Sequence, residues 1–517
     1  MKVRASNNSN ISELNSVRKP NNRLTNMPKQ AKLSVIVMAL TLSACSTPSG
    51  LSEKNALQTI EKNSPVRWQT ETVNENAVQD GWLASFNDSA LEKMVAYALQ
   101  YNYQLQAQRI NVALAKERLN VSEASDYPEL SLSLDNSRRK QTSANATSYQ
   151  TDASISTDLR YELDLWGKLS DEQNQNRLNY AATQANYQQS KLDLVANISK
   201  AWFDLTQAQQ LLALYQERAD NLQRNLAMIQ SSYQLGLNDA LDVYLTKNNV
   251  NQELARVAQQ QQTLKQQSRS LELLLGDYPF AAKLAEQNLP LIDSDIQIGL
   301  PAQLLTRRAD IQAGWLELLA LDAGLAVAHK QRFPSINLTA NVSDSDNDIA
   351  NLLDGGALAW SLIGSISTPL FNAGRLESLE QQARLAVEQK EQQYLQQVYQ
   401  AFADAENSLS ERNSLIQRYD YYVKAQENAV AAEKLSFDQY LRGLVTYTTV
   451  LESQRRSFDA QTTVIQLTNQ LLQNRIDIYS ALGGNYLNTA TKSFAHESEL
   501  HASTVSRTNI NRTNMEK

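Results

Sequence analysis

The stretch Tyr161-Glu-Leu-Asp-Leu-Trp-Gly-Lys-Leu-Ser170 joins two different periodicities. Apolar residues fall on alternate positions between Ala153 and Leu165, which is the period of a strand with one apolar face. Residues 170–233 then contain no Pro and no Gly and carry apolar residues at helical spacing. The sequence therefore predicts a strand that turns into a very long helix at Gly167, where the missing Cβ permits the change of backbone direction.

A second copy of this pattern lies about 207 residues further along the chain. Apolar residues alternate between Leu358 and Leu370, and Phe371-Asn-Ala-Gly-Arg375 opens another Gly-free run to about residue 440. Four landmarks recur at offsets of 206, 207, 207 and 207 residues: Tyr127-Pro128 with Phe333-Pro334, Gly167 with Gly374, Gly236 with Gly443, and Gly276 with Gly483. This regular spacing predicts a tandem duplication.

Composition limits the classes of function. The 517 residues carry a net charge of −7, which gives no general attraction to nucleic acid. The single cysteine excludes an internal disulfide, and the histidines (His329, His496 and His501) are scattered. No metal-ligand spacing or Gly-rich phosphate loop is present, so the sequence predicts neither an enzyme nor a metal or cofactor site. Beyond the leader, we expect no segment to reach the ~18–20 apolar residues of a membrane-spanning helix.

The N-terminus has the pattern of a signal peptide. Residues 1–26 are polar, and Met27 is followed by two lysines and the short apolar run 33–42. Translation starts at Met1 or at Met27, and the sequence leaves both open.

The end of this leader carries the only cysteine. Residues 42–45, Leu-Ser-Ala-Cys, resemble the bacterial lipoprotein box, in which the cysteine is lipidated and becomes the mature N-terminus. Ser46 in place of Asp suggests transfer to the outer membrane. We therefore expect a leader over 1–44 and a covalent lipid on Cys45, whose chains contribute ~0.8 kcal/mol per buried CH₂. The alternative is an ordinary signal peptide with an incidental cysteine.

The remaining chain divides into an arm, two repeats, a linker and a tail. The predicted ranges are 45–89 for the arm, 90–276 for repeat 1, 277–302 for the linker (equatorial region), 303–483 for repeat 2 and 484–517 for the polar tail. Repeat 1 is expected to contain a helix from Ala90 to about Ser125, a β-hairpin 128–165 with a polar loop 137–149, a long helix 170–233 and a return helix 239–275. Repeat 2 is expected to contain a helix, a hairpin 334–370 with a loop 343–356, a long helix 375–440 and a return helix 446–482.

The predicted helices and strands indicate a membrane conduit. A helix of about 65 residues spans on the order of 100 Å, which suits a passage across the periplasm better than a globular domain. Alternating strands joined by polar loops are typical of outer-membrane hairpins. Four strands cannot form an open sheet in lipid, because the edge groups would remain unpaired. Two chains would give a filled barrel of about eight strands, and three would give about twelve and leave a lumen.

The chain resembles the TolC-like outer-membrane efflux factors, specifically the lipidated, NodT-type branch that works with resistance-nodulation-division pumps. The resemblance covers about residues 65–487. The matching stretches are Asp80-Gly-Trp-Leu-Ala-Ser-Phe86, 161–168, Leu300-Pro-Ala-Gln-Leu-Leu-Thr-Arg-Arg-Ala-Asp-Ile311, Phe333-Pro-Ser-Ile336, 369–375 and Tyr479-Ser-Ala-Leu-Gly-Gly484. Ala309 stands where the family often has Pro, a departure that bears on the start of the next helix.

The resemblance implies an α + β membrane protein in the outer membrane of a Gram-negative bacterium. It implies a homotrimer in which four strands per chain form a 12-stranded β-barrel, continued by a long periplasmic α-helical barrel. It also implies three kinds of partner: outer-membrane lipid, a periplasmic adaptor (membrane fusion) protein and an inner-membrane pump. The implied function is the passive conduction of small molecules to the exterior as part of a tripartite efflux system. A conduit for type I protein secretion, which shares the fold, is the alternative.

The candidate gate lies at the predicted periplasmic tips, where the turns at Gly236 and Gly443 are farthest from the strands. Asp239 and Asp242 follow the first turn, and Thr449 and Glu452 follow the second. Relatives carry two acidic residues three apart at the second tip, so the resemblance implies a lumen ring in which this chain keeps only Glu452. Three such carboxylates would repel, favouring cations or raised pKa values. The alternative is that Glu452 lies on a solvated helix face.

Other conspicuous residues have structural interpretations. Gly167 and Gly374 are expected to be hinges between strand and helix. Arg307, Arg308 and Asp310 are expected to form ion pairs near a helix start. Trp166 fits an aromatic girdle at the membrane interface, and it fits packing at the strand–helix junction equally well.

Overall fold

The computed structural model describes residues 80–487 except 144, 145, 238, 286, 287, 293–295, 353, 355 and 356, together with residues 59, 60, 62, 65, 67–69 and 78. The chain divides into two units, Met1–Pro48 and Ser49–Lys517, and all described residues lie in the second. The predicted leader, the alternative starts at Met1 and Met27, and the lipidation site Cys45 lie outside the described residues. So does the tail beyond residue 487.

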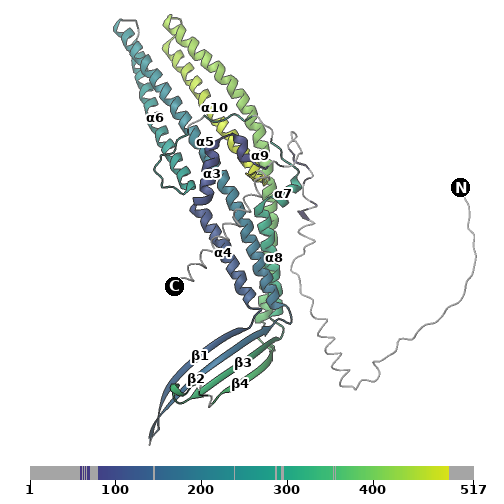
Figure 1. The fold of residues 1–517 in the computed structure, drawn as a ribbon. Coiled ribbons are helices and arrows are strands. Elements are labelled where there is room, and N and C mark those ends of the chain that lie inside the picture. The colour runs from purple at the N-terminus through teal and green to yellow at the C-terminus, as the bar shows by residue number, and fades with distance from the viewer. Residues whose placement is uncertain are drawn as a thin grey trace, which may run out of the picture. The chain divides into compact units, whose positions relative to one another are not determined.

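The helices and strands of the second unit follow one order twice (Figure 1). The first half contains η1 (Trp82–Phe86), α3 (Ser89–Tyr101), α4 (Tyr103–Ala124), β1 (Glu129–Ser143), β2 (Ala146–Leu163), α5 (Lys168–Gln234) and α6 (Ala240–Leu275). The second half contains α7 (Pro301–Arg307), α8 (Ala309–Lys330), β3 (Ser335–Asp346), η2 (Ile349–Asn351), β4 (Ala359–Ser367), α9 (Arg375–Leu441) and α10 (Tyr447–Ala481). The long helices α5 and α9 both have 67 residues.

The four strands form one antiparallel sheet in the order β1-β2-β3-β4, at the opposite end of the helices from the α5–α6 and α9–α10 turns (Figure 1). Residues that pair directly share a face of such a sheet. Leu130 pairs with Leu159, Leu159 with Ala340, and Ala340 with Leu362, so apolar residues run across all four strands on one face. The other face carries polar sets such as Ser131, Asp158, Asn341 and Ser361. The sheet is therefore amphipathic, and in a single chain its edges β1 and β4 are open.

The predicted loops of both hairpins were too long. β1 continues to Ser143 and β2 begins at Ala146, so most of the predicted loop 137–149 is strand. Arg138 pairs with Thr151 in this extension, and the Arg138 guanidinium lies 5.2 Å from the centre of the Tyr149 ring. In the second hairpin β3 runs to Asp346, inside the predicted loop 343–356. Alternating apolar residues mark only the part of a strand that has one apolar face, whereas the backbone ladder also forms where both faces are polar.

Two predicted helices are each divided by one extended residue. Asn102 ends α3 and caps α4, because its Oδ1 accepts a hydrogen bond from the Leu105 N–H at 2.8 Å. Its Nδ2 donates to the Leu274 carbonyl at 2.8 Å, which ties the break to α6. The single predicted helix from Ala90 to Ser125 was therefore wrong. In the second repeat Arg308 is the extended residue, and α8 begins directly at Ala309.

Helix α8 also corrects an expectation from composition. By length and hydropathy it could cross a membrane, although no segment beyond the leader was expected to reach this limit. Its buried residues include Ile311, Leu318 and Leu325, and the helix packs between α5 and α9. An apolar composition on most sides suits a helix that lies between two others.

The largest cluster of buried apolar residues joins η1, α3, α5, α9 and α10. Trp82 of η1 stacks on Tyr479 of α10 with ring centroids 6.0 Å apart, and Phe86 packs against Phe203 of α5 at 5.1 Å. The Trp202 indole donates a hydrogen bond to Asp88, the N-cap of α3, at 2.7 Å. These contacts fix η1 and α3 against one side of the long helices.

Candidate functional site

The two tip turns have the same backbone geometry. Gly236 and Gly443 both have φ of +73°, a left-handed conformation that strongly favours glycine. The N–H of Leu237 donates to the Ser232 carbonyl at 3.0 Å, and the N–H of Leu444 donates to the Gln439 carbonyl at 2.9 Å. A Cβ at either glycine would meet nothing within 4 Å, so backbone conformation alone selects glycine there.

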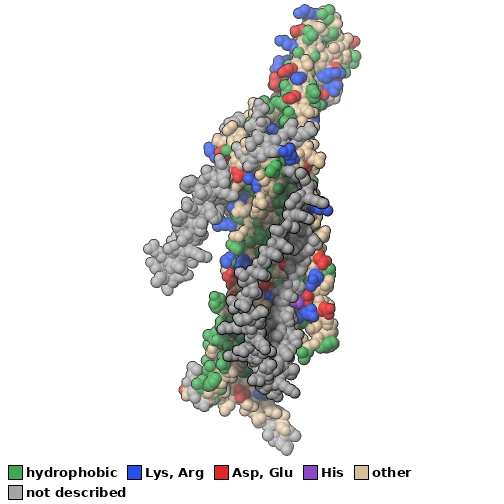
Figure 2. Space-filling model, turned by 90° about the vertical axis from the view of Figure 1, so that its right-hand side faces the viewer, with side chains coloured by type: hydrophobic (Ala, Val, Ile, Leu, Met, Phe, Trp, Pro, Cys, Tyr) green, Lys and Arg blue, Asp and Glu red, His purple; other side chains and the backbone are tan. Residues whose placement is uncertain are grey.

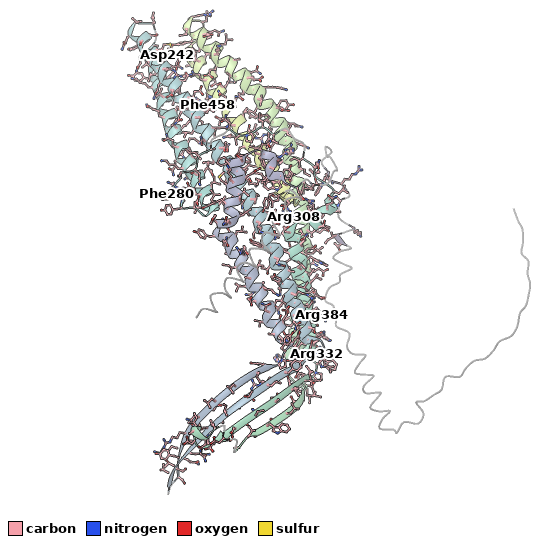
Figure 3. All side chains as sticks on the ribbon, viewed as in Figure 1. Asp242, Phe280, Arg308, Arg332, Arg384 and Phe458 are labelled. Atoms are coloured by element: carbon pink, nitrogen blue, oxygen red, sulfur yellow. The ribbon has the colours of Figure 1, made fainter. Side chains whose placement is uncertain are left out.

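The helix pairs α5–α6 and α9–α10 each form a helical hairpin with its turn at one tip. The first tip contains a carboxylate that contacts the second helical hairpin. Asp239 caps α6 by accepting a hydrogen bond from the Leu241 N–H at 3.2 Å. Asp242, labelled near the turn end of α6 in Figure 3, accepts a hydrogen bond from Tyr440 of α9. Burial and then repulsion from Asp239 raise the pKa of Asp242, and the Tyr440 hydrogen bond opposes them. Asp242 thus links the two hairpins within one chain.

Tyrosines at the second tip complete this contact, and sequence reasoning missed them. Tyr447, the first residue of α10, is 1% exposed and packs against Ile229, Val243 and Val450 in a small apolar cluster. Its ring lies 5.2 Å from that of Tyr440. The repeat offset could have indicated it, because Ala240 occupies the corresponding position of the first tip. The large side chain is present in one repeat only and fills the space between the hairpins.

The second tip carries its acid in a different environment. Glu452 accepts hydrogen bonds from Arg455 at 2.9 Å and from Arg456 at 2.7 Å. The Arg456 and Arg455 guanidinium groups hold the pKa of Glu452 below its ordinary value. Within one chain the arginines thus lower this pKa, and the raised pKa expected for three Glu452 carboxylates around one axis stays a prediction. Charged side chains of both signs are interspersed at this end of the molecule in Figure 2.

Thr449 does not complete an acidic pair with Glu452. Its hydroxyl lies 3.2 Å from that of Thr446, the N-cap residue of α10, and is part of the turn that starts this helix. Near this tip Glu452 thus lies beside the guanidinium groups of Arg455 and Arg456, and Arg455 also pairs with Asp459 at 3.3 Å.

A charged contact further from the tip joins α5, α6 and α10. Arg218 of α5 pairs with Glu253 of α6 at 3.2 Å and lies over the Phe458 ring of α10 at 3.9 Å. Glu253 is 2% exposed, and burial raises the pKa of its carboxyl. A buried carboxylate needs a cation beside it. The ion pair therefore joins α5 to α6, and the contact of Arg218 with Phe458 joins this pair to α10.

The first strand–helix junction is closely supported. Gly167 is the N-cap of α5 with φ of +74°, and the Lys330 ammonium donates to its carbonyl at 3.1 Å. The Trp166 indole donates to the Pro334 carbonyl at 2.6 Å, and its ring packs against Phe333 with centroids 5.7 Å apart. Trp166 therefore packs at the junction, which is one of its two interpretations, and its place in an aromatic girdle stays a prediction. In the sequence, only its position at the end of the strand indicated this.

The second junction is more open. Gly374 caps α9 with φ of +82°, and nothing lies within 4 Å of the place a Cβ would take. The preceding Leu370 and Phe371 are 92% and 89% exposed. Just beyond, Arg332 and Arg384 lie near each other (Figure 3), and both pair with Glu380 of α9.

Arg307, Arg308 and Asp310 form ion pairs around the break between α7 and α8. Arg308 pairs with Asp310 at 2.7 Å and with Asp404 at 3.7 Å, and Arg307 pairs with Asp80. The Arg307 pair joins α7 to the segment before η1, and the Arg308 pairs join the start of α8 to α9, all of them far from both tips. Among the described residues, no group of three or more His, Cys, Asp or Glu could hold a metal ion.

The chain is similar to proteins of outer-membrane efflux systems. A family model described as "Outer membrane efflux protein" matches residues 95–277 and 300–484. The probable outer membrane lipoprotein SilC of Salmonella typhimurium is 28% identical over 417 residues, covering 80% of this chain and 90% of that one. The solvent efflux pump outer membrane protein SrpC of Pseudomonas putida is 29% identical over 418 residues, covering 78% and 86%.

A solved structure shares the fold. The crystal structure of CusC, described with its folding and transmembrane channel formation, matches at 26% identity and a TM-score of 0.73. The match covers 82% of this chain and 98% of that chain. The family and these names favour efflux over the alternative of polypeptide secretion. The two family matches fall one on each repeat, and the chain therefore belongs to the outer membrane efflux protein family, as an outer-membrane component of an efflux system.

Proposed function

We propose that three copies of the chain close their sheets into a 12-stranded barrel and that small molecules pass through it passively. The amphipathic four-stranded sheet carries this proposal. Its apolar face suits lipid, its polar face suits a water-filled lumen, and its open edges need neighbouring strands. Three copies supply about twelve strands, enough to leave a lumen inside the barrel.

The long helices continue the conduit. At 1.5 Å per residue, a helix such as α5 spans on the order of 100 Å. Pairs of such helices from three chains form an α-helical barrel that reaches across the periplasm. At its tip the barrel meets a periplasmic adaptor and, beyond it, an inner-membrane pump of the resistance-nodulation-division class. In this role the chain catalyses no reaction and needs no group beyond a covalent lipid on Cys45, which anchors it in outer-membrane lipid.

The tips act as the gate in this proposal. Tyr440, Tyr447 and Asp242 hold the two hairpins of each chain together, and separating them widens the opening. Glu452, with Thr449 one turn before it, lies close to the lumen and sets the charge that ions meet there together with Arg455 and Arg456. Asp239 and the glycines Gly236 and Gly443 shape the turns, and Gly167 and Gly374 join barrel to helices.

The test is an image of the purified full-length protein in detergent together with conductance in planar lipid. We expect threefold symmetry, a cylinder continued from the barrel, and single-channel currents. A monomeric particle without currents would contradict the proposal. Cys45→Ser should remove the lipid, detected by mass spectrometry of the mature N-terminus, while the trimer still forms. A mature wild-type chain without lipid would overturn that part of the proposal alone.

A further inference from the structure

A polar recess of about 570 Å³ lies between α5, α9 and α10. One acidic side chain from each of the three helices lines it: Asp204, Glu411 and Asp477. We propose that this recess binds an organic cation with several N–H donors, such as an alkylammonium or guanidinium compound, within the channel. This inference rests on the proposed function and names a class of cargo for it.

The recess opens on the side of the helices that can line a lumen. Trp202 faces the N-cap of α3, and Phe203 faces η1, so the covering segments occupy that side of α5. Asp204 lies two residues after Trp202, about 200° further around the helix. Asp204 also lies one residue after Phe203, about 100° around the helix. Because α3 covers the side of Trp202, Asp204 points away from that cover, towards a side that can face the interior of a closed trimer.

The carboxylates of the recess offer acceptor oxygens with few donors to satisfy them. Oδ1 of Asp204 accepts hydrogen bonds from Asn469, at 2.8 Å, and from Gln473, while Asp477 pairs with Lys200 through one oxygen. Within the described part of the chain, the second oxygen of each carboxylate has no hydrogen bond, and Glu411 has no partner. Burial raises the pKa of Asp204, and the hydrogen bonds from Asn469 and Gln473 and the charge of Lys200 oppose this shift.

Two buried amide oxygens provide an independent indication of a donor ligand. Asn469 and Asn474 line the recess and are 5% and 2% exposed. Nδ2 of Asn474 donates to the Ser408 carbonyl at 2.8 Å, and Nδ2 of Asn469 donates to carboxylate and amide oxygens. These acceptors fix the orientation of both amides. Each Oδ1 is then buried without a hydrogen-bond partner among the described residues, a costly arrangement unless something donates to it.

The shape and ligand set favour an organic cation over a bare metal ion. Among the described residues, no group of three or more acidic, His or Cys side chains is close enough to hold a metal ion. The volume lies within the range of small-molecule sites, about 300–1,000 Å³. A ligand with several separated N–H donors can reach carboxylates on different helices and the two amide oxygens together.

The test uses spermidine and the full-length trimer in detergent, with binding measured by titration calorimetry. The Asp204→Asn/Glu411→Gln double variant should weaken spermidine binding at least about tenfold, about 1.4 kcal/mol. Glu411→Gln alone, at an exposed position, should weaken it in the same direction and guards against misfolding of the double variant. The control is Glu427→Gln, which removes one negative charge from an exposed position of α9 outside the recess, as Glu411→Gln does within it. It should leave spermidine binding unchanged.

Calcium and conductance separate the possible failures. Calcium chloride should bind more weakly than spermidine and be insensitive to Glu411→Gln. If calcium bound as tightly as spermidine and lost affinity in the Glu411→Gln variant, the recess would not be specific for organic cations and the proposal would be overturned. A wild-type channel that conducts but neither binds spermidine nor is blocked by it would overturn the recess alone. Absence of any wild-type conductance would contradict the channel itself, and calorimetry would still report on the recess.

Discussion

The two helix tips share a backbone and differ in chemistry. Gly236 and Gly443 make the same left-handed turn with the same hydrogen bonds. The first tip then presents Asp242, whose pKa is raised by burial, and the second presents Glu452, whose pKa is lowered by two arginines. The duplication therefore preserved the element that reverses the chain and left the side chains free to take different roles. At the first tip Asp242 bonds to the second helical hairpin, and at the second tip the charge of Glu452 is compensated by two arginines.

The largest effect is expected from Tyr447→Ala, which gives the second tip the residue that the first has at this position. Removing a large, fully buried aromatic side chain should cost about 3 kcal/mol and separate the hairpins. Thermal unfolding and single-channel conductance should show a less stable and more open tip. Tyr244→Ala, at a 70% exposed tyrosine of α6, is the matched control. Equal effects of the two changes would argue against the inter-hairpin role of Tyr447.

Next in size are Gly236→Ala and Gly443→Ala. Each places a Cβ in a left-handed conformation at a cost of about 1 kcal/mol, with no steric contact to add to it. Because the turns are equivalent, the two changes should lower the unfolding temperature by equal amounts. A marked inequality would show that the neighbouring side chains, and not the backbone, decide the turns.

A smaller effect is expected from pH at the first tip. A carboxyl whose pKa is raised in the contact favours the protonated form, so stability falls as pH rises through the window above its ordinary value of 3.8. Lowering the pH towards that value should therefore strengthen the tip contact and reduce conductance. Asp242→Asn keeps an acceptor for Tyr440 and should lose most of this dependence. An unchanged pH profile in the variant would assign the effect to another group.

The smallest effect on stability is expected at Glu452. Its lowered pKa means that its contribution is present above the ordinary value of 4.5 and is lost as pH falls through the lowered one, the opposite sign from Asp242. Glu452→Ala should lower the unfolding temperature only slightly, weaken the closed state and raise conductance. Selectivity should shift towards anions, because Arg456 loses its partner and Arg455 keeps only Asp459. Reversal potentials in a salt gradient measure the selectivity. Unchanged single-channel behaviour would place Glu452 on a solvated face without a role in the pore.

The sequence predicted the duplication and the long helices because both depend on local signals. A few neighbouring residues are enough to show the apolar alternation of the strands. The same holds for the strand–helix junctions at Gly167 and Gly374. The break at Asn102 was missed because helical periodicity continues through it. Its side chain caps α4 locally through the Leu105 N–H and also bonds to Leu274 of α6, a contact that no local pattern shows.

The tip contacts could be predicted only in part. The Arg455 and Arg456 partners of Glu452 lie three and four residues away, the spacing at which helical side chains meet, and were available from the sequence. The meeting of Asp242 with Tyr440 joins residues from different repeats and depends on how the hairpins pack. No local sequence pattern shows that Asp242 and Tyr440 come into contact.

The equal length of α5 and α9 restricts how this protein can evolve. Each has 67 residues, so the two hairpins of a chain end at the same level. Deleting seven residues from each helix of one helical hairpin would shorten that hairpin by roughly 10 Å and leave the two tips at different levels. In the proposed assembly, the adaptor would then contact only one of the two tips of each chain. An insertion or deletion in one helical hairpin should therefore be tolerated only when the other hairpin changes by the same length.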